Sequence, residues 1–148
     1  INFTIPEMDS LQKAQSFIGK ISQNGKAYFL STKKEDNRWV GKSKSLGEFV
    51  VSRDSIAPKI VPLNFKNEQW LSNYSFLKFK IEDDYTGIKS YRGEINGKWI
   101  LLEYEPKNNT LIFDFSDLDF EQALHEVTIE AEDSVGNKTT FAIDFYRK

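Results

Sequence analysis

The sequence predicts an all-β protein: an immunoglobulin-like antiparallel β-sandwich preceded by a smaller β unit. Three observations lead to this prediction. Apolar and polar residues alternate at period two along much of the chain, as in half-buried antiparallel strands. Turn signals separate these segments at short intervals. The 148 residues include 14% aromatics and no Cys, so a core must form by packing without a disulfide framework.

The first third of the chain contains five short candidate strands. Gln23–Gly25 predicts a turn between the second and third, because Asn and Gly tolerate tight-turn geometry. One short helical stretch is expected, at Met8–Ser16. The expected strands are Asn2–Ile5, Ser16–Ser22, Lys26–Ser31, Trp39–Lys42 and Glu48–Arg53.

From residue 58 onward the alternation becomes strict. Leu77, Phe79 and Ile81 share one face of a strand whose other face carries charged residues, and three later segments repeat the pattern. Asn96-Gly97 between two apolar runs is the strongest hairpin signal in the chain. A second short helical stretch is expected at Asp117–Leu124. The seven expected strands are roughly 59–65, 76–82, 88–95, 98–105, 110–116, 126–133 and 138–146.

A boundary between two units is expected near residue 58. Pro58 imposes an extended backbone on the residue before it, and the charge balance changes there. Residues 1–57 carry 9 basic and 6 acidic side chains, whereas 58–148 carry 11 and 16. We therefore expect a small β unit at 1–57 and the sandwich domain at 58–148. The small unit is either the back half of a preceding sandwich or a strand group that packs on the main domain.

Composition narrows the classes of function. A net charge of −2 argues against nucleic acid as a partner. No apolar run reaches the roughly 18 to 20 residues of a membrane span. A single His and no Cys exclude zinc sites built from several His or from thiolates. The chain begins at Ile1 without a signal-peptide pattern, so we expect a processed chain or a piece of a longer one.

Acidic and amide side chains predict a calcium site at one pole of the sandwich. If the strands alternate in direction, the linker before the first strand, one strand connection and the last hairpin meet there. Hard cations favour such oxygen ligands. The alternative is turn chemistry alone, because Asp and Asn cap turns through their own backbone. The candidate ligands are Asp54, Asp83, Asp84, Asp133 and Asn137; no other cofactor is expected.

Two further groups are candidates for a metal or catalytic site. A second possible calcium site at the opposite pole is an acidic run that lacks the residue order of an EF-hand; it comprises Asp114, Asp117, Asp119 and Glu121. His125 begins a strand, with no G-x-S-x-G nucleophile elbow in the chain. We expect His125 to be structural and the chain to have no catalytic residue. The chain has enough Asp and Glu residues that their number alone does not exclude a catalytic carboxylate pair of the kind that glycosidases use.

Exposed aromatic residues would favour glycan binding, because Trp and Tyr stack on sugar rings. The candidates are Trp70, Trp99 and Tyr91, with Tyr104 as a further aromatic residue. Core packing is the alternative explanation. A modest basic group in the first third is expected to form a solvated strand face. It could instead attract an anionic envelope polymer or the acidic second unit. It comprises Lys33, Lys34, Arg38, Lys42 and Lys44.

Several segments together resemble a known family. The most specific runs from Asp83-Asp84 through Gly87-Ile88 to Asn96-Gly97-Lys98-Trp99. In this stretch and around it, the chain resembles the non-catalytic C-terminal β-sandwich region of lysostaphin-type (LytM-like) zinc metallopeptidases of Bacteroidetes. The other matching segments are Leu46–Val50, Arg53–Ile60, Asn64–Phe65, Gln69–Tyr74, Phe79–Asp84, Gly87–Tyr91 and Asp133–Asn137.

The resemblance implies an accessory role. The peptidase's His-x-His zinc pair is absent, since Glu126 and Val127 follow His125. The expected function is to position or target an attached cell-wall peptidase through protein or glycan contacts, in the periplasm, at the cell envelope or outside the cell. The expected partners are that peptidase domain and peptidoglycan or another glycan. An independent carbohydrate-binding or adhesin-type module is the alternative.

Overall fold

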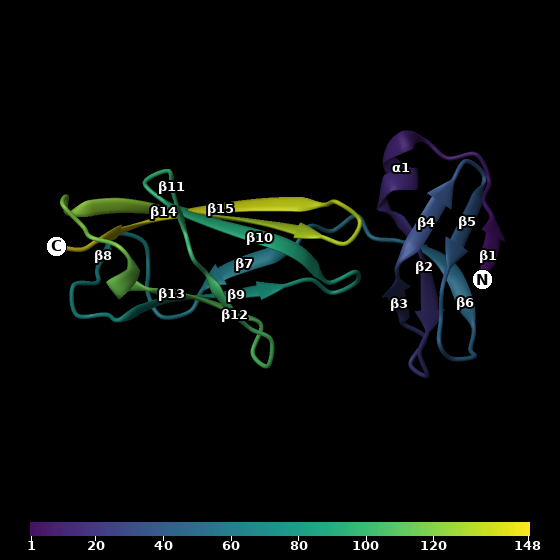
Figure 1. Ribbon diagram of the computed structural model, residues 1–148, viewed down its shortest axis with the longest axis horizontal. Coiled ribbons are helices and arrows are strands. Elements are labelled where there is room, and N and C mark those ends of the chain that lie inside the picture. Colours follow the sequence, from purple (N-terminus) through teal and green to yellow (C-terminus); the bar gives the residue numbers. More distant parts are fainter.

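The computed structural model describes residues 1–148 and places two β units end to end (Figure 1). The N-terminal unit consists of two three-stranded sheets and one helical turn and a half, α1. One sheet has the strand order β1-β5-β4, and the other has the order β3-β2-β6. The elements are β1 (Asn2–Thr4), α1 (Ser10–Gln15), β2 (Ser16–Ile21), β3 (Ala27–Leu30), β4 (Thr32–Glu35), β5 (Arg38–Gly41) and β6 (Phe49–Arg53).

The N-terminal unit has a small core. Its buried apolar residues are Ile5, Phe17, Ile18 and Trp39, and all of them except Phe17 form one cluster. The Nζ atom of Lys34 lies 5.1 Å from the centre of the Trp39 ring and donates hydrogen bonds to the carbonyl groups of Lys13 and Ala14 at the end of α1. Burial lowers the pKa of Lys34. Lys34 is therefore part of the packing of this unit, whereas Lys33, Arg38, Lys42 and Lys44 are exposed as expected.

The second unit is an immunoglobulin-like β-sandwich, as the sequence predicts. Its five-stranded sheet has the order β11-β10-β14-β15-β8, and its four-stranded sheet has the order β12-β13-β9-β7. Read as strands A to G, the four-stranded sheet is the ABED sheet of that fold, and the five-stranded sheet is its CFG sheet with β11 added beside strand C and β8 beside strand G. The strands are β7 (Lys59–Pro62), β8 (Gln69–Trp70), β9 (Phe76–Glu82), β10 (Ile88–Ile95), β11 (Lys98–Ile100), β12 (Glu103–Glu105), β13 (Thr110–Asp114), β14 (Leu124–Asp133) and β15 (Lys138–Tyr146).

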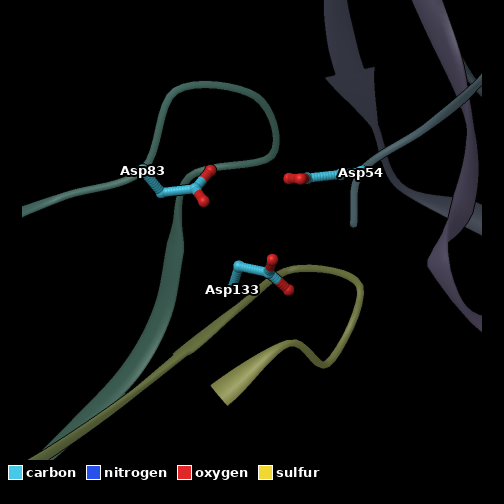
Figure 2. A group of neighbouring side chains, drawn as sticks. All are labelled: Asp54, Asp83 and Asp133. Carbon is cyan, nitrogen blue, oxygen red and sulfur yellow. The ribbon is translucent and has the colours of Figure 1, made fainter. Parts of the chain in front are cut away.

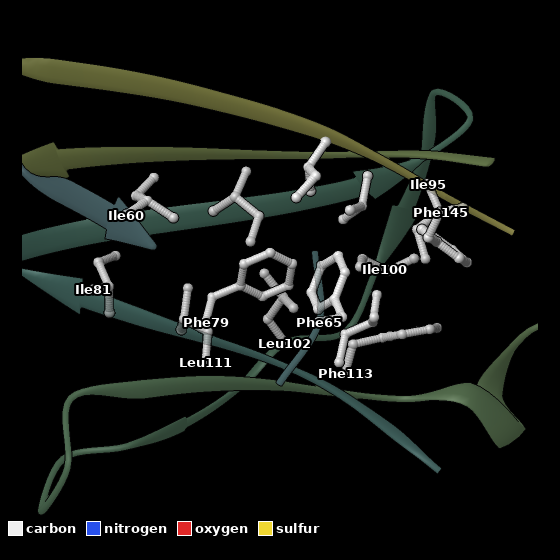
Figure 3. Packing of buried hydrophobic residues seen from close by; sticks show 14 of the residues in the cluster. Ile60, Phe65, Phe79, Ile81, Ile95, Ile100, Leu102, Leu111, Phe113 and Phe145 are labelled. Carbon is white, nitrogen blue, oxygen red and sulfur yellow. The ribbon is translucent and has the colours of Figure 1, made fainter. Parts of the chain in front are cut away.

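The core of the sandwich lies between the two sheets (Figure 3). It contains 17 buried apolar residues, against four in the N-terminal unit, so most of the hydrophobic stabilisation resides in the sandwich. Alternate residues of β9 and of the middle of β14 (127–131) contribute, which confirms the predicted alternation. Phe65 packs edge to face against Phe79 with ring centres 5.4 Å apart, a favourable aromatic geometry.

Three local predictions were wrong. The segment 98–105 is not one strand: β11 pairs with β10 in one sheet and β12 pairs with β13 in the other, so the chain changes sheets at Leu101. The helix expected at Asp117–Leu124 is absent, because Asp114 caps a 3-10 turn, η1 (Phe115–Asp117), and β14 already begins at Leu124. Strands β4 and β8 were not expected. Both are short, and tertiary pairing rather than local pattern defines them.

The linker between the units runs from Asp54 to Pro58, and no sheet crosses it. The hydrophobic clusters likewise fall on either side of it. No helix of the structure has the length and apolar character needed to span a membrane.

We predict that Phe79→Ala destabilises the protein by about 3–5 kcal/mol, because it removes a fully buried ring from the centre of the sandwich. Urea-induced unfolding monitored by tryptophan fluorescence measures this change. Leu63→Ala is the control, since Leu63 is 50% exposed and its loss should alter the unfolding free energy by less than about 1 kcal/mol. Equal effects of the two variants would contradict this description of the core.

Candidate functional site

Three carboxylates meet where the two units join. Asp54 lies in the linker, Asp83 follows β9, and Asp133 ends β14. One oxygen of each lies within 4.8 Å of one oxygen of the others, and Figure 2 shows the side chains converging from three separate segments. Asp54 and Asp133 are 1% and 0% exposed. Buried carboxylates this close together repel one another unless a proton or a cation lies among them.

Each carboxylate also shapes its own loop. Oδ2 of Asp83 accepts hydrogen bonds from the backbone N–H groups of Tyr85, Thr86 and Gly87. Oδ1 of Asp133 accepts from the N–H groups of Val135 and Asn137. These bonds are the turn chemistry that the sequence suggests, and they fix the positions of the carboxylates without neutralising their charge.

Asn137 is the centre of the contacts between the two units. Its Nδ2 group donates to Oδ2 of Asp133 at 2.7 Å and to the carbonyl oxygen of Asp54 at 3.0 Å. Its Oδ1 atom accepts from Nε2 of Gln15 at 2.8 Å, and Gln15 in turn accepts from Arg53. One amide side chain thus ties the end of α1, the linker and the last hairpin of the sandwich together.

Further contacts reinforce this junction. Thr86 donates from Oγ1 to Oδ2 of Asp54 at 2.8 Å, and Thr139 donates from Oγ1 to the carbonyl oxygen of Pro58. The Nζ atom of Lys26 lies 5.6 Å from the centre of the Tyr85 ring. These contacts are polar or cation–π, so the junction depends on directional bonds that define an orientation between the units.

The electrostatics of the cluster centre on Asp54. Burial raises the pKa of its carboxyl, and repulsion from Asp83 and Asp133 adds to the rise, while hydrogen bonds from Ile56 and Thr86 oppose it. No basic side chain forms an ion pair with any of the three carboxylates. The protonated or cation-bound cluster is therefore favoured over three bare charges.

The predicted calcium ligands are only partly brought together. Asp54, Asp83 and Asp133 could offer carboxylate oxygens to one hard cation, and Oδ1 of Asp83 accepts no hydrogen bond. Asn137 touches the cluster through its NH₂ group, which donates to the carboxylate of Asp133, so its side-chain oxygen is not a ligand in this arrangement. Asp84 is exposed and lies outside the group.

The opposite pole contains no comparable cluster. A groove of about 740 Å³ is lined by Asp117, Asp119, Glu121 and His125, but the acidic side chains are exposed and do not form a close group. Asp114 instead accepts from the N–H of Ser116, and this bond lowers the pKa of Asp114.

His125 is buried and fully hydrogen-bonded. Its Nδ1 atom lies 2.9 Å from Nδ2 of Asn96, and its Nε2 atom lies 2.7 Å from the carbonyl oxygen of Gln122. Because Asn96 can only donate there and the carbonyl can only accept, the ring is a neutral imidazole with its proton on Nε2. No carboxylate orients it, so the arrangement favours a structural role.

The aromatic candidates divide between two faces of the five-stranded sheet. Trp70 and Trp99 are 58% and 59% exposed, and the strand register places both on its outer face. Trp70 stacks on Tyr146 with ring centres 5.2 Å apart. Tyr91 pairs with the buried Ala131 and therefore lies on the inner face, where its ring contacts Tyr104 across the open edge of the sandwich.

Sequence reasoning missed several residues of these sites. Gln15 and Thr86 carried no signal, because both contact residues far away in the chain, 122 and 32 positions distant. Tyr146 could have been suspected, since the alternation of Phe141, Ile143 and Phe145 directs it to the opposite, outer face.

Comparison with known proteins does not identify a family or a function for this chain. No protein-family model and no curated protein matches the chain. Among solved structures, the chain is similar to the fibronectin(III)-like modules of Clostridium thermocellum CbhA. The two are 10% identical over 97% of this chain and 82% of that one, with a TM-score of 0.46. The function must therefore be argued from this chain's own residues.

We predict that Asp54→Asn removes a pH dependence of stability. The raised pKa of Asp54 means that the native state loses stability as pH rises through that pKa, because the buried carboxyl then ionises beside two others. The amide is neutral, and its oxygen can still accept from the N–H of Ile56. As pH rises through that pKa, in a chelator, the variant should therefore lose less stability than the parent, and the difference should become constant above it.

Unfolding free energies from urea titrations between about pH 4 and pH 8 measure this difference. Asp84→Asn is the matched control, because it removes a carboxylate from the same loop outside the cluster. Parallel pH profiles for the parent and Asp54→Asn would contradict the electrostatic description.

Proposed function

We propose that the chain is a non-catalytic accessory region that holds an attached cell-wall peptidase domain in position at the cell envelope. The observation that carries the proposal is the polar junction around Asn137, which joins the two units at a defined orientation. A rigid spacer is useful where one domain must reach a polymer while another is anchored. The segments that resemble the C-terminal region of LytM-like peptidases are the reason for proposing a peptidase as the attached domain.

The proposal includes a calcium ion at the junction. Asp54, Asp83 and Asp133 supply three oxygen ligands, and a divalent cation would offset the repulsion among them. The ion would stiffen the contact between the units, because its ligands come from the linker and from two loops of the sandwich.

A specific observation also favours the alternative, an independent carbohydrate-binding or adhesin-type module. Two exposed Trp residues lie on one face of one sheet, and one of them stacks on Tyr146. Flat aromatic surfaces of this kind can stack on sugar rings. Under this alternative the outer face is the functional site and the junction only supports it.

The first prediction of this proposal concerns the parent gene. We expect the coding sequence upstream of Ile1 to contain a domain with a His-x-His zinc pair. Deleting residues 1–148 from that parent should leave hydrolysis of a small soluble peptide unchanged and reduce hydrolysis of intact cell-wall sacculi at least about tenfold. Detectable hydrolysis of sacculi by the isolated chain would overturn the non-catalytic assignment.

The second prediction concerns calcium. Calcium at 100 times its dissociation constant stabilises a one-site protein by about 2.7 kcal/mol. We therefore expect the melting temperature to rise by at least about 4 °C relative to a chelator. Asp83→Asn should abolish this rise, whereas Asp84→Asn, one residue away and outside the cluster, should keep it. Calorimetric titration without a binding signal would refute the calcium site.

A further inference from the structure

The outer face of the five-stranded sheet forms a second surface with its own chemistry. The register arranges its side chains in rows that run across the strands. One row contains Leu124, Tyr146 and Trp70, from β14, β15 and β8. Another, four residues away along β15, contains Trp99, Glu94, Thr128 and Ala142. Aromatic residues therefore lie at both outer edges of the face.

Two carboxylates lie between these rows. Glu126 of β14 is directly opposite Asp144 of β15, on the same face. Directly opposed like charges destabilise a sheet pair. Neither carboxylate forms an ion pair or accepts a hydrogen bond, whereas Glu94, Glu130 and Glu132 on the same face pair with Arg92, Lys138 and Lys89. The Glu126–Asp144 pair therefore leaves two uncompensated negative charges on the outer face, and this charge is complementary to a cationic ligand.

The spacing fits an extended ligand. Trp99 and Trp70 lie on the two edge strands, four strand intervals apart, and strands are separated by about 4.8 Å, so the aromatic side chains are on the order of 20 Å apart. A single sugar cannot contact both. A flat chain of several sugar rings could stack on both tryptophans while its middle lies over Glu126 and Asp144.

We propose that this face binds a polysaccharide of amino sugars that carry free, protonated amino groups. The pyranose faces stack on Trp99 and on the Trp70–Tyr146 pair, and the ammonium groups of the intervening sugars donate to the carboxylates of Glu126 and Asp144. The inference rests on the alternative function above, and it names the class of glycan. A polyanion is disfavoured by the same two carboxylates.

The inference is tested with two probes of equal length, a hexamer of β-1,4-linked glucosamine and the corresponding hexamer of N-acetylglucosamine. Calorimetric titration at low salt, slightly acidic pH and in a chelator should show at least about tenfold tighter binding of the glucosamine hexamer. The double substitution Glu126→Gln and Asp144→Asn should remove this preference. Trp99→Ala should weaken the binding of both hexamers.

Glu121→Gln is the control for the double variant, because Glu121 is an exposed carboxylate in the loop before β14 and should leave both affinities unchanged. All variants alter exposed or half-exposed side chains, and circular dichroism verifies their folding.

Each remaining outcome counts against the inference in a distinct way. Equal binding of the two hexamers would overturn it and leave glycan binding in place. Binding of neither would overturn both the inference and the carbohydrate-binding alternative, without touching the accessory role. Polylysine that binds more tightly than the glucosamine hexamer, with the same dependence on Glu126, would show that the face recognises a basic polypeptide instead.

Discussion

The hydrogen bonds of Asn137 are the contact on which the arrangement of this protein depends. The N-terminal unit buries only four apolar residues, and it shares no sheet with the sandwich. A unit of about 57 residues buries a small share of its surface and is marginally stable alone. The hydrogen bonds that Asn137 forms with Asp133, with the linker carbonyl of Asp54 and with Gln15 therefore stabilise the N-terminal unit and define its orientation relative to the sandwich.

The carboxylates at this junction stabilise their loops through hydrogen bonds, but their negative charges repel one another. Asp83 and Asp133 must be acidic or amide residues to close their loops, since each accepts several backbone N–H groups. Asp54 caps the linker in the same way through the N–H of Ile56. Satisfying three loops with carboxylates at one point concentrates negative charge in a buried place. The raised pKa of Asp54 is the electrostatic consequence, and a proton or a cation resolves it.

On the outer face of the sandwich, packing of the core does not determine which residues occur. Alternation in β14 and β15 is needed to fill the core, but it leaves the choice of outward residues free. Most of these outward charges are paired across or along the strands. Glu126 and Asp144 are not, and they lie between exposed aromatic residues. Because nothing in the fold requires this combination, the face and the junction are independent candidates for function.

The fold class, the strictly alternating strands and the pole at which the acidic loops lie could all be predicted from the sequence. Period-two alternation identified β9, β10 and β15 to the residue, because burial on one face is a local pattern. Other features depend on tertiary contacts. The tertiary structure divided 98–105 between two sheets, placed Tyr91 on the inner face and Trp70 on the outer one, and made Asn137 a donor to the cluster. Those features depend on contacts between residues that are distant in the chain, and such contacts produce no periodic pattern in the sequence from which they could be predicted.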